Sequence, residues 1–276
     1  MKNKFTFLLY LLFPIAVTFI ASGFGNTLVT VGAFIVSLLL LAFFLRADLL
    51  MLMGMHAYQT NRSKGFVLME HAMKTGKLRP KSRLLYAYLL VRNGELDEAE
   101  RIINKTTYLG KDILKDADFK TAEFNLALID WKRGRLADAI MKAEKLYSEG
   151  YLNGNLYGTL GYFYIANNEI DKAIELSKEA VEYNPDDLIC RDNLGQAYII
   201  SGELDKAQEI YDDVLKRDPE FIEPYYNYAT LLEKRAELAD AADYYRKALT
   251  YPQKYLSTVT HEQAEDALAR VEELLK

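Results

Sequence analysis

The segment MLMGMH (51–56) holds the residues of this chain best suited to metal chemistry. Methionine thioether and histidine imidazole groups are soft ligands that can bind copper. On a helix, however, Met51 and Met55 share one face, whereas Met53 points away from it. Methionine is also common at adaptable packing surfaces. We therefore interpret these residues as packing residues and expect no metal and no other cofactor.

Motifs of the common enzyme classes are missing from the sequence. It contains no GxSxG, no HExxH and no acidic calcium loop. The segment TGKLRP (75–80) lacks the Ser or Thr and the upstream glycine of a phosphate-binding loop. The histidines His71 and His261 have no ligand-like spacing. The sequence therefore predicts a binding protein and not an enzyme.

The charge of the chain argues against a nucleic-acid partner. Two of the 34 basic residues, Lys2 and Lys4, lie before residue 46, and all 39 acidic residues follow it, so the later segment carries a net charge of −7. A nucleic-acid binder needs a basic face. The single cysteine, Cys190, excludes an intramolecular disulfide and a multi-cysteine metal site, and is expected to pack inside a helix.

The first 45 residues contain two apolar stretches. Residues 5–22 and 27–45 carry no charged residue, and a transmembrane helix needs roughly 20 apolar residues. The sequence GFGN (23–26) between them is typical of a tight turn. We therefore interpret residues 1–46 as a transmembrane hairpin that contacts the lipid bilayer through two helices.

The charges that flank the hairpin predict its orientation. Lys2 and Lys4 precede the first stretch, and Arg46, Arg62 and Lys64 follow the second. Because cytoplasmic flanks carry excess Lys and Arg, both ends of the hairpin and the rest of the chain are expected in the cytoplasm. A cleaved signal peptide is the alternative interpretation of the first stretch. The second stretch would then still return the chain to the cytoplasm.

Five short motifs recur after the hairpin. They read GELDEA, GRLADA, NEIDKA, GELDKA and AELADA, and they end at Ala99, Ala139, Ala173, Ala207 and Ala241. The spacings are 40, 34, 34 and 34 residues. A fixed period near 34 with helical patterning is typical of stacked helix pairs. The sequence thus predicts an all-α solenoid, in which each pair completes the core of its neighbour.

Residues 188–221 illustrate one unit. A first helix is expected over 188–201, with an apolar face formed by Leu194, Ala197 and Tyr198. Gly202 permits the left-handed turn that ends a helix. In the second helix, Ala207 is small where two helices must pass closely. Pro219 ends the unit because it cannot continue a helix.

These residues resemble the tetratricopeptide repeat (TPR) family, whose pattern places Leu-Gly, Tyr, Ala, an aromatic residue, Ala and Pro at set offsets. One unit supplies Leu160, Gly161, Tyr164, Ala173, Ala180 and Pro185, and the next supplies Leu194, Gly195, Tyr198, Ala207, Tyr211 and Pro219. The match is strong over 154–253 and weaker before it. The resemblance implies a TPR-like α-solenoid of stacked helix pairs. With the hairpin inferred above, we expect a membrane-anchored TPR protein.

The repeat pattern also predicts the domain organisation. TPR-like units are expected in the region 80–257, over residues 80–113, 120–153, 154–187, 188–221 and 222–253. Residues 47–79 are interpreted as a junction and a degenerate first repeat, and six extra residues near 106–118 as a longer loop. Thr260 and Gln263 form a capping-box pair, which predicts a C-terminal capping helix within 258–276.

In this family the first helix of each unit lines a concave binding face. The corresponding positions give a groove of Tyr88, Val91, Phe124, Leu128, Trp131, Tyr162, Ile165, Asp192, Gln196, Ile199, Tyr226 and Thr230. Two interpretations remain open for its aromatic residues. They bind an apolar or amphipathic peptide, or they pack against neighbouring helices.

Some family members bind a C-terminal carboxylate with paired lysine and asparagine residues. That clamp is not supported here, because the positions that need lysine hold Phe124, Asp192 and Tyr226. The accompanying asparagines could still hydrogen-bond the backbone of a partner; they are Asn125, Asn193 and Asn227.

We expect a membrane-tethered scaffold or adaptor that docks a protein or peptide client at the cytoplasmic face of a bacterial cell membrane. The alternative is a structural subunit that packs through its hairpin within a larger membrane complex. Ala33 and Ser37, one helical turn apart, offer a close-packing face for that role. The repeats do not identify the partner, since a fold does not determine a function.

Overall fold

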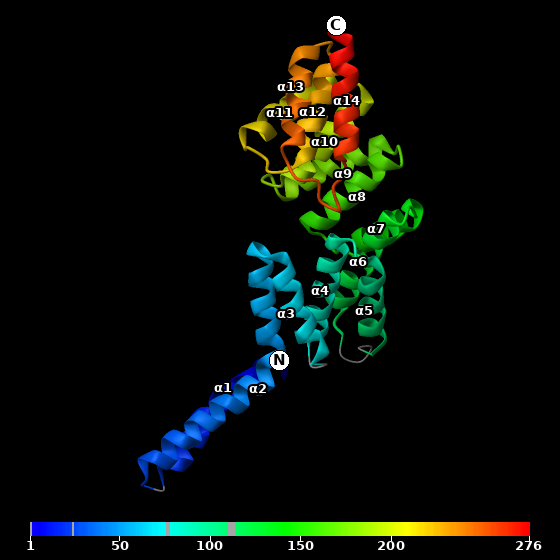
Figure 1. The fold of residues 1–276 in the computed structure, drawn as a ribbon. Helices are drawn as coiled ribbons and strands as arrows, with labels where there is room; N and C mark the ends of the chain where they lie inside the picture. Colours follow the sequence, from blue (N-terminus) through cyan, green and yellow to red (C-terminus); the bar gives the residue numbers. More distant parts are fainter. Residues whose placement is uncertain (1, 24, 76–77, 110–113) are drawn as a thin grey trace. The chain divides into compact units, whose positions relative to one another are not determined.

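The computed structural model describes residues 2–23, 25–75, 78–109 and 114–276, and within these ranges it contains fourteen helices and no strand (Figure 1). The helices form two compact units, Met1–Arg83 and Leu84–Lys276. The prediction of an all-helical, TPR-like solenoid is confirmed for the second unit.

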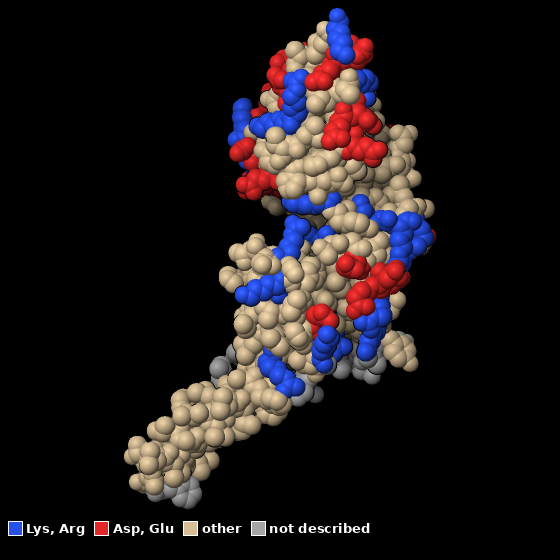
Figure 2. Space-filling view, viewed as in Figure 1, with Lys and Arg blue, Asp and Glu red and all other residues tan. Residues whose placement is uncertain are grey.

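The first unit contains α1 (Lys2–Ser22), α2 (Thr27–Thr60) and α3 (Arg62–Lys74). Figure 1 shows α1 beside the first half of α2, and Figure 2 shows a surface without charged side chains over most of this hairpin. The Asn26 side chain begins α2 by accepting hydrogen bonds from the backbone N–H groups of Leu28 and Val29, at 3.0 and 3.3 Å. The helix then continues unbroken to Thr60.

Glycines allow α2 and α3 to pack closely. A Cβ atom at Gly65 would lie 2.6 Å from Cα of Tyr58, and one at Gly54 would lie 2.6 Å from Cγ of Met69. Next to this contact, the rings of Tyr58 and Phe66 meet edge to face with centroids 5.4 Å apart. A larger side chain at either glycine would push the two helices apart.

The second unit consists of antiparallel helix pairs followed by one further helix. The first two pairs are α4 (Pro80–Asn93) with α5 (Leu96–Leu109) and α6 (Asp116–Lys132) with α7 (Leu136–Ser148). The next three are α8 (Gly154–Ala166) with α9 (Ile170–Tyr183), α10 (Leu188–Ser201) with α11 (Leu204–Lys216), and α12 (Ile222–Lys234) with α13 (Leu238–Leu249). The last helix is α14 (His261–Leu274).

Several sequence predictions are confirmed in this unit. The helix α10 has the predicted bounds. The capping box at the start of α14 is present, because Gln263 N donates to Thr260 Oγ1 and Thr260 N donates to Gln263 Oε1. Of the longer loop expected near 106–118, residues 106–109 belong to α5 and residues 110–113 lie outside the described residues.

The first residue of each recurring motif turns the chain between the two helices of a pair. All five have a positive φ, with +88° at Gly94, +78° at Gly134, +59° at Asn168, +85° at Gly202 and +62° at Ala236. Glycine adopts this left-handed conformation readily. For Ala236 the same conformation costs about 1–2 kcal/mol because Cβ crowds the following carbonyl oxygen.

Buried asparagines join the first helices of successive pairs. Nδ2 of Asn125 on α6 donates to the carbonyl oxygen of Leu84 on α4 at 3.0 Å. Nδ2 of Asn193 on α10 likewise donates to the carbonyl oxygen of Gly158 on α8 at 2.8 Å. Buried amides need such partners. These side chains are therefore used inside the solenoid and do not present free donors to the backbone of a partner.

The third asparagine meets a buried carboxylate instead of a carbonyl group. Nδ2 of Asn227 on α12 donates to both oxygens of Asp192 on α10, at 3.1 and 3.2 Å, and the Tyr211 hydroxyl donates to Oδ1 at 3.0 Å. Burial raises the pKa of Asp192 to about 7, and the nearby Glu223 also raises it, whereas the hydrogen bonds from Asn227 and Tyr211 oppose the shift.

The turn geometry predicts opposite effects for two substitutions. Gly202→Ala should lower the free energy of unfolding by about 1 kcal/mol, and the cost is confined to the backbone because no atom lies within 4 Å of the added Cβ. Ala236→Gly should instead raise it, by up to about 1 kcal/mol, because strain is removed. Urea unfolding followed by the fluorescence of Trp131, the only tryptophan, measures both. Shifts of the same sign would contradict this account of the turn.

The raised pKa of Asp192 predicts a pH-dependent stability. The folded state holds this proton more tightly than the unfolded chain, whose aspartate pKa is about 3.9. The free energy of unfolding should therefore fall as pH rises from about 4 to about 7, and then level off. Asp192→Asn should flatten this profile and, at pH 7.5, stabilise the protein by on the order of 1–3 kcal/mol. Asp266→Asn, at an exposed position of α14, is the control. An unchanged slope in Asp192→Asn would refute the assignment.

Candidate functional site

The twelve predicted groove residues all lie on the first helices of the pairs. Tyr88 and Val91 are on α4, and Phe124, Leu128 and Trp131 are on α6; Tyr162 and Ile165 are on α8, Asp192, Gln196 and Ile199 are on α10, and Tyr226 and Thr230 are on α12. Each pair thus contributes to one series of side chains, as the resemblance implies.

Burial divides this series into two halves. Six of the side chains are buried, namely Val91, Phe124, Leu128, Ile165, Asp192 and Ile199. The other six keep part of their surface accessible, namely Tyr88, Trp131, Tyr162, Gln196, Tyr226 and Thr230. A partner could touch the second set directly, whereas contact with the first set would need a rearrangement.

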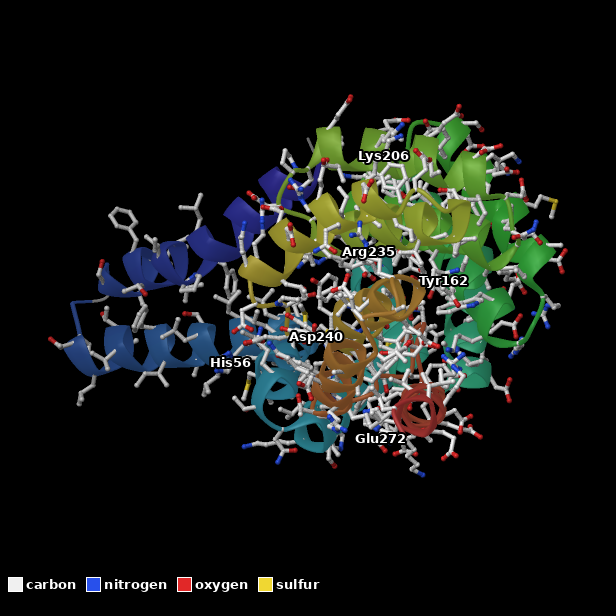
Figure 3. The ribbon with its side chains drawn as sticks, turned by 90° about the horizontal axis from the view of Figure 1, so that it is seen from above. His56, Tyr162, Lys206, Arg235, Asp240 and Glu272 are labelled. Carbon is white, nitrogen blue, oxygen red and sulfur yellow. The ribbon has the colours of Figure 1, made fainter. Side chains whose placement is uncertain are left out.

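Trp131 links two consecutive first helices. Its ring meets that of Tyr162 edge to face with centroids 5.4 Å apart, and that of Phe163 at 5.6 Å. Burial raises the pKa of Tyr162, and the charge of Glu223 adds to the effect. In Figure 3, Tyr162 lies among the side chains in the interior of the helical array, whereas Lys206 and Glu272 lie at its edge. These aromatic residues therefore both pack and retain some accessible surface.

At the last pair, the predicted groove residues are tied to their own unit. The rings of Tyr226 and Tyr245 lie 5.4 Å apart, and Oγ1 of Thr230 is 3.2 Å from the Tyr245 hydroxyl oxygen. That hydroxyl group also donates to Glu233, which accepts two hydrogen bonds from Arg270 on α14. The last helix is thus fastened to the last pair by charged groups as well as by its apolar face.

The segment between α13 and α14 belongs to this site, although the sequence pattern did not reveal it. We call residues 251–259 the strap. At its start, the ring of Tyr251 stacks on that of Tyr225 with centroids 4.8 Å apart. Toward its end, Thr258 N donates to Oε1 of Glu223 at 2.8 Å, and Val259 is buried against Ile222. The signals in the sequence were the aromatic and apolar residues between the two helices, namely Tyr251, Tyr255, Leu256 and Val259.

The middle of the strap reaches the other end of the repeat array. The ring centroid of Tyr255 lies 5.0 Å from Nζ of Lys132, the last residue of α6. A Cβ atom at Gly94, in the turn after α4, would lie 3.1 Å from Cε2 of Tyr255. Lys132 also lies over the Trp131 ring, with Nζ 4.4 Å from its centroid. Its ammonium group is therefore close to two aromatic rings, and burial lowers the pKa of Lys132.

The ionisable and aromatic groups on the first-helix side set the chemistry that this side can offer. Burial raises the pKa of the Cys190 thiol to about 12, so the thiol stays protonated at neutral pH. Among the described residues, no group of three His, Cys, Asp or Glu side chains could hold a metal ion. The first-helix side offers aromatic surface, the buried carboxylates of Asp192 and Glu223, and the ammonium group of Lys132.

Comparison with known proteins identifies the repeats. Sequence profiles of the tetratricopeptide repeat match residues 168–234 and 80–104. No curated protein matches the sequence.

Three solved structures illustrate the similarity in fold, and two of them are TPR proteins. A tetratricopeptide repeat protein from Parabacteroides merdae is 13% identical, with a TM-score of 0.62, and the alignment covers 94% of this chain and 97% of that one. A thermophilic TPR protein from Thermus thermophilus is 20% identical, with a TM-score of 0.54 and coverage of 71% and 99%. Pseudomonas aeruginosa PilF is 16% identical, with a TM-score of 0.52 and coverage of 71% and 90%. At these identities the similarity concerns the fold alone. The sequence profiles and the structure together show tetratricopeptide repeats at residues 80–104 and 168–234 of an all-helical solenoid.

Proposed function

We propose that this chain is a membrane-tethered scaffold that docks a protein or peptide client on the concave side of its TPR solenoid, in the cytoplasm. TPR-fold proteins are generally non-enzymatic and bind other proteins. The observation that carries the proposal is the set of partly accessible aromatic residues on four of the five first helices, α4, α6, α8 and α12: Tyr88, Trp131, Tyr162 and Tyr226. Aromatic side chains in concave sites often provide most of the binding energy.

The apolar surface of α2 supports the membrane tether. This helix is long and apolar enough to cross a bilayer, and only 6% of its most apolar 18-residue window is buried. The core helix of a soluble protein would be mostly buried. The described apolar part of α1, Leu12–Ser22, is shorter than a full span. That α1 also crosses the membrane is therefore part of the proposal. A signal sequence near the N-terminus is the competing interpretation.

The alternative function is a structural subunit that packs through the hairpin. It relies on the close-packing face formed by Ala33 and Ser37. Ser37 is already buried in the structure, with 2% of its surface exposed. That burial leaves less of the small-residue face for another subunit and favours the scaffold.

Photo-crosslinking in the native membrane tests the docking surface. A photoreactive phenylalanine at position 162 should give a discrete intermolecular adduct, which mass spectrometry would identify as the client. The same group at Tyr108, which is 76% exposed on the second helix of the first pair, serves as the matched control. An adduct at both positions, or at neither, would contradict a docking surface on the first helices.

Labelling of single cysteines in intact cells tests the membrane topology. Ser22→Cys, in the turn region of the hairpin, should react with a membrane-impermeant maleimide from outside. Ser148→Cys, at the end of α7, should react only after the cells are permeabilised. Cys190 is buried and its thiol pKa is raised, so little background labelling is expected. External labelling at Ser148→Cys would overturn the orientation. A mature protein that lacks residues 1–22 would show that the first stretch is a signal peptide.

A further inference from the structure

The strap crosses the same side of the solenoid on which the predicted groove residues lie. Thr258 contacts Glu223 near the start of α12. Tyr255 contacts Lys132 at the end of α6 and lies next to Gly94, in the turn that directly follows α4. These positions belong to first helices or to the turn that ends one. The segment therefore spans from the last helix pair to the first two along the first-helix side.

The two ends of the strap are anchored firmly. Tyr251 stacks on Tyr225 with an interplanar angle of 6°, and the two hydroxyl groups are joined at 3.1 Å. Tyr251 O also lies 2.8 Å from Nε2 of His261 at the start of α14. At the other end, Val259 is buried. Displacing these ends would disturb the core of the last pair.

The tip of the strap has a different character. It is a turn, in which Ser257 N donates to Lys254 O at 3.0 Å and Lys254 N donates to Ser257 Oγ at 3.2 Å. Tyr255 projects from this turn and keeps 38% of its surface exposed, and Lys254 is exposed as well. The contacts that join Tyr255 to the first two pairs, with Lys132 and next to Gly94, are thus separate from both anchors.

The surroundings of Tyr255 favour an aromatic side chain at this position. Lys132 presents its ammonium group to the ring face, where a cation–π interaction is favourable. Trp131 lies beside the same ammonium group, and Gly94, without a Cβ, leaves room for the ring edge. We call Gly94, Trp131 and Lys132 the aromatic seat.

We propose that the strap is an intramolecular ligand of the concave side, and that a client binds by placing an aromatic side chain of an extended or turn segment in the aromatic seat instead of Tyr255. This inference rests on the proposed docking function and names the chemistry of its client. The strap then competes with the client, so that docking is weaker than the open surface would allow.

A peptide-binding experiment with the full chain in detergent tests this inference. The probe is a fluorescein-labelled peptide with the sequence of residues 251–260, YPQKYLSTVT, and the readout is fluorescence anisotropy. Tyr255→Ala should bind the probe about five- to thirty-fold more tightly than the wild-type chain, the range that a cation–π contact of ordinary strength implies. A second peptide with alanine in place of the fifth residue should lose this gain.

Two further variants control for other causes. Tyr255→Phe keeps a ring in the seat, so it should bind the probe as weakly as the wild-type chain. Lys132→Met added to Tyr255→Ala removes the cation, so it should abolish the gain. Equal affinity of wild type and Tyr255→Ala for the probe would overturn the proposal, as would equal binding of the tyrosine and alanine peptides. Unfolding in urea verifies that each variant is folded.

Failure of this inference is distinguishable from failure of the proposed function. A client adduct at position 162 together with no gain in peptide binding would refute the strap as a competitor and leave the docking function standing. A peptide gain with no adduct at position 162 in the membrane would support the aromatic seat and refute the docking function there. If both hold, the adduct yield at position 162 should rise in Tyr255→Ala.

Discussion

The close approach of neighbouring helices is the constraint on which the rest of the solenoid depends. A single helix pair cannot bury its apolar face, so each pair must pack against the next. Glycine allows the two helices of one pair to meet closely at Gly195, where a Cβ atom would lie 2.7 Å from the Tyr211 ring. It allows successive pairs to meet at Gly161, where a Cβ atom would lie 3.2 Å from Nδ2 of Asn193. Tyr211 is fully buried as a result. A small residue on one helix thus faces a large residue on its neighbour, as Gly195 faces Tyr211.

The same packing aligns the first helices of successive pairs. The asparagine hydrogen bonds hold successive first helices in register, and at the last step the chain replaces a carbonyl acceptor with the Asp192 carboxylate. A buried carboxylate that receives two neutral donors and no cation remains costly to ionise. Asp192 therefore belongs to the interior of the solenoid, beneath the surface that a client would meet.

The first-helix side of the solenoid is in part covered by the chain itself. Six of the side chains expected to line it are buried, and the strap places Tyr255 against Lys132. Burial removes part of the hydration of Lys132 and lowers its pKa, and the aromatic rings beside it replace some of that stabilisation. The groove aromatics pack against neighbouring helices, and a ring such as that of Trp131 also keeps part of its surface accessible. Peptide binding by these rings stays a prediction.

The sequence by itself determined the features that depend on local chemistry. The 34-residue period, the bounds of α10, the left-handed Gly202 and the capping box of Thr260 and Gln263 all follow from helical periodicity, turn residues and capping groups a few positions apart. Only the tertiary structure decided which groove residues are buried, where Asn193 finds its acceptor and where Tyr255 lies. These outcomes join residues 35 or more positions apart. They depend on how the stacked pairs curve, which no local pattern encodes.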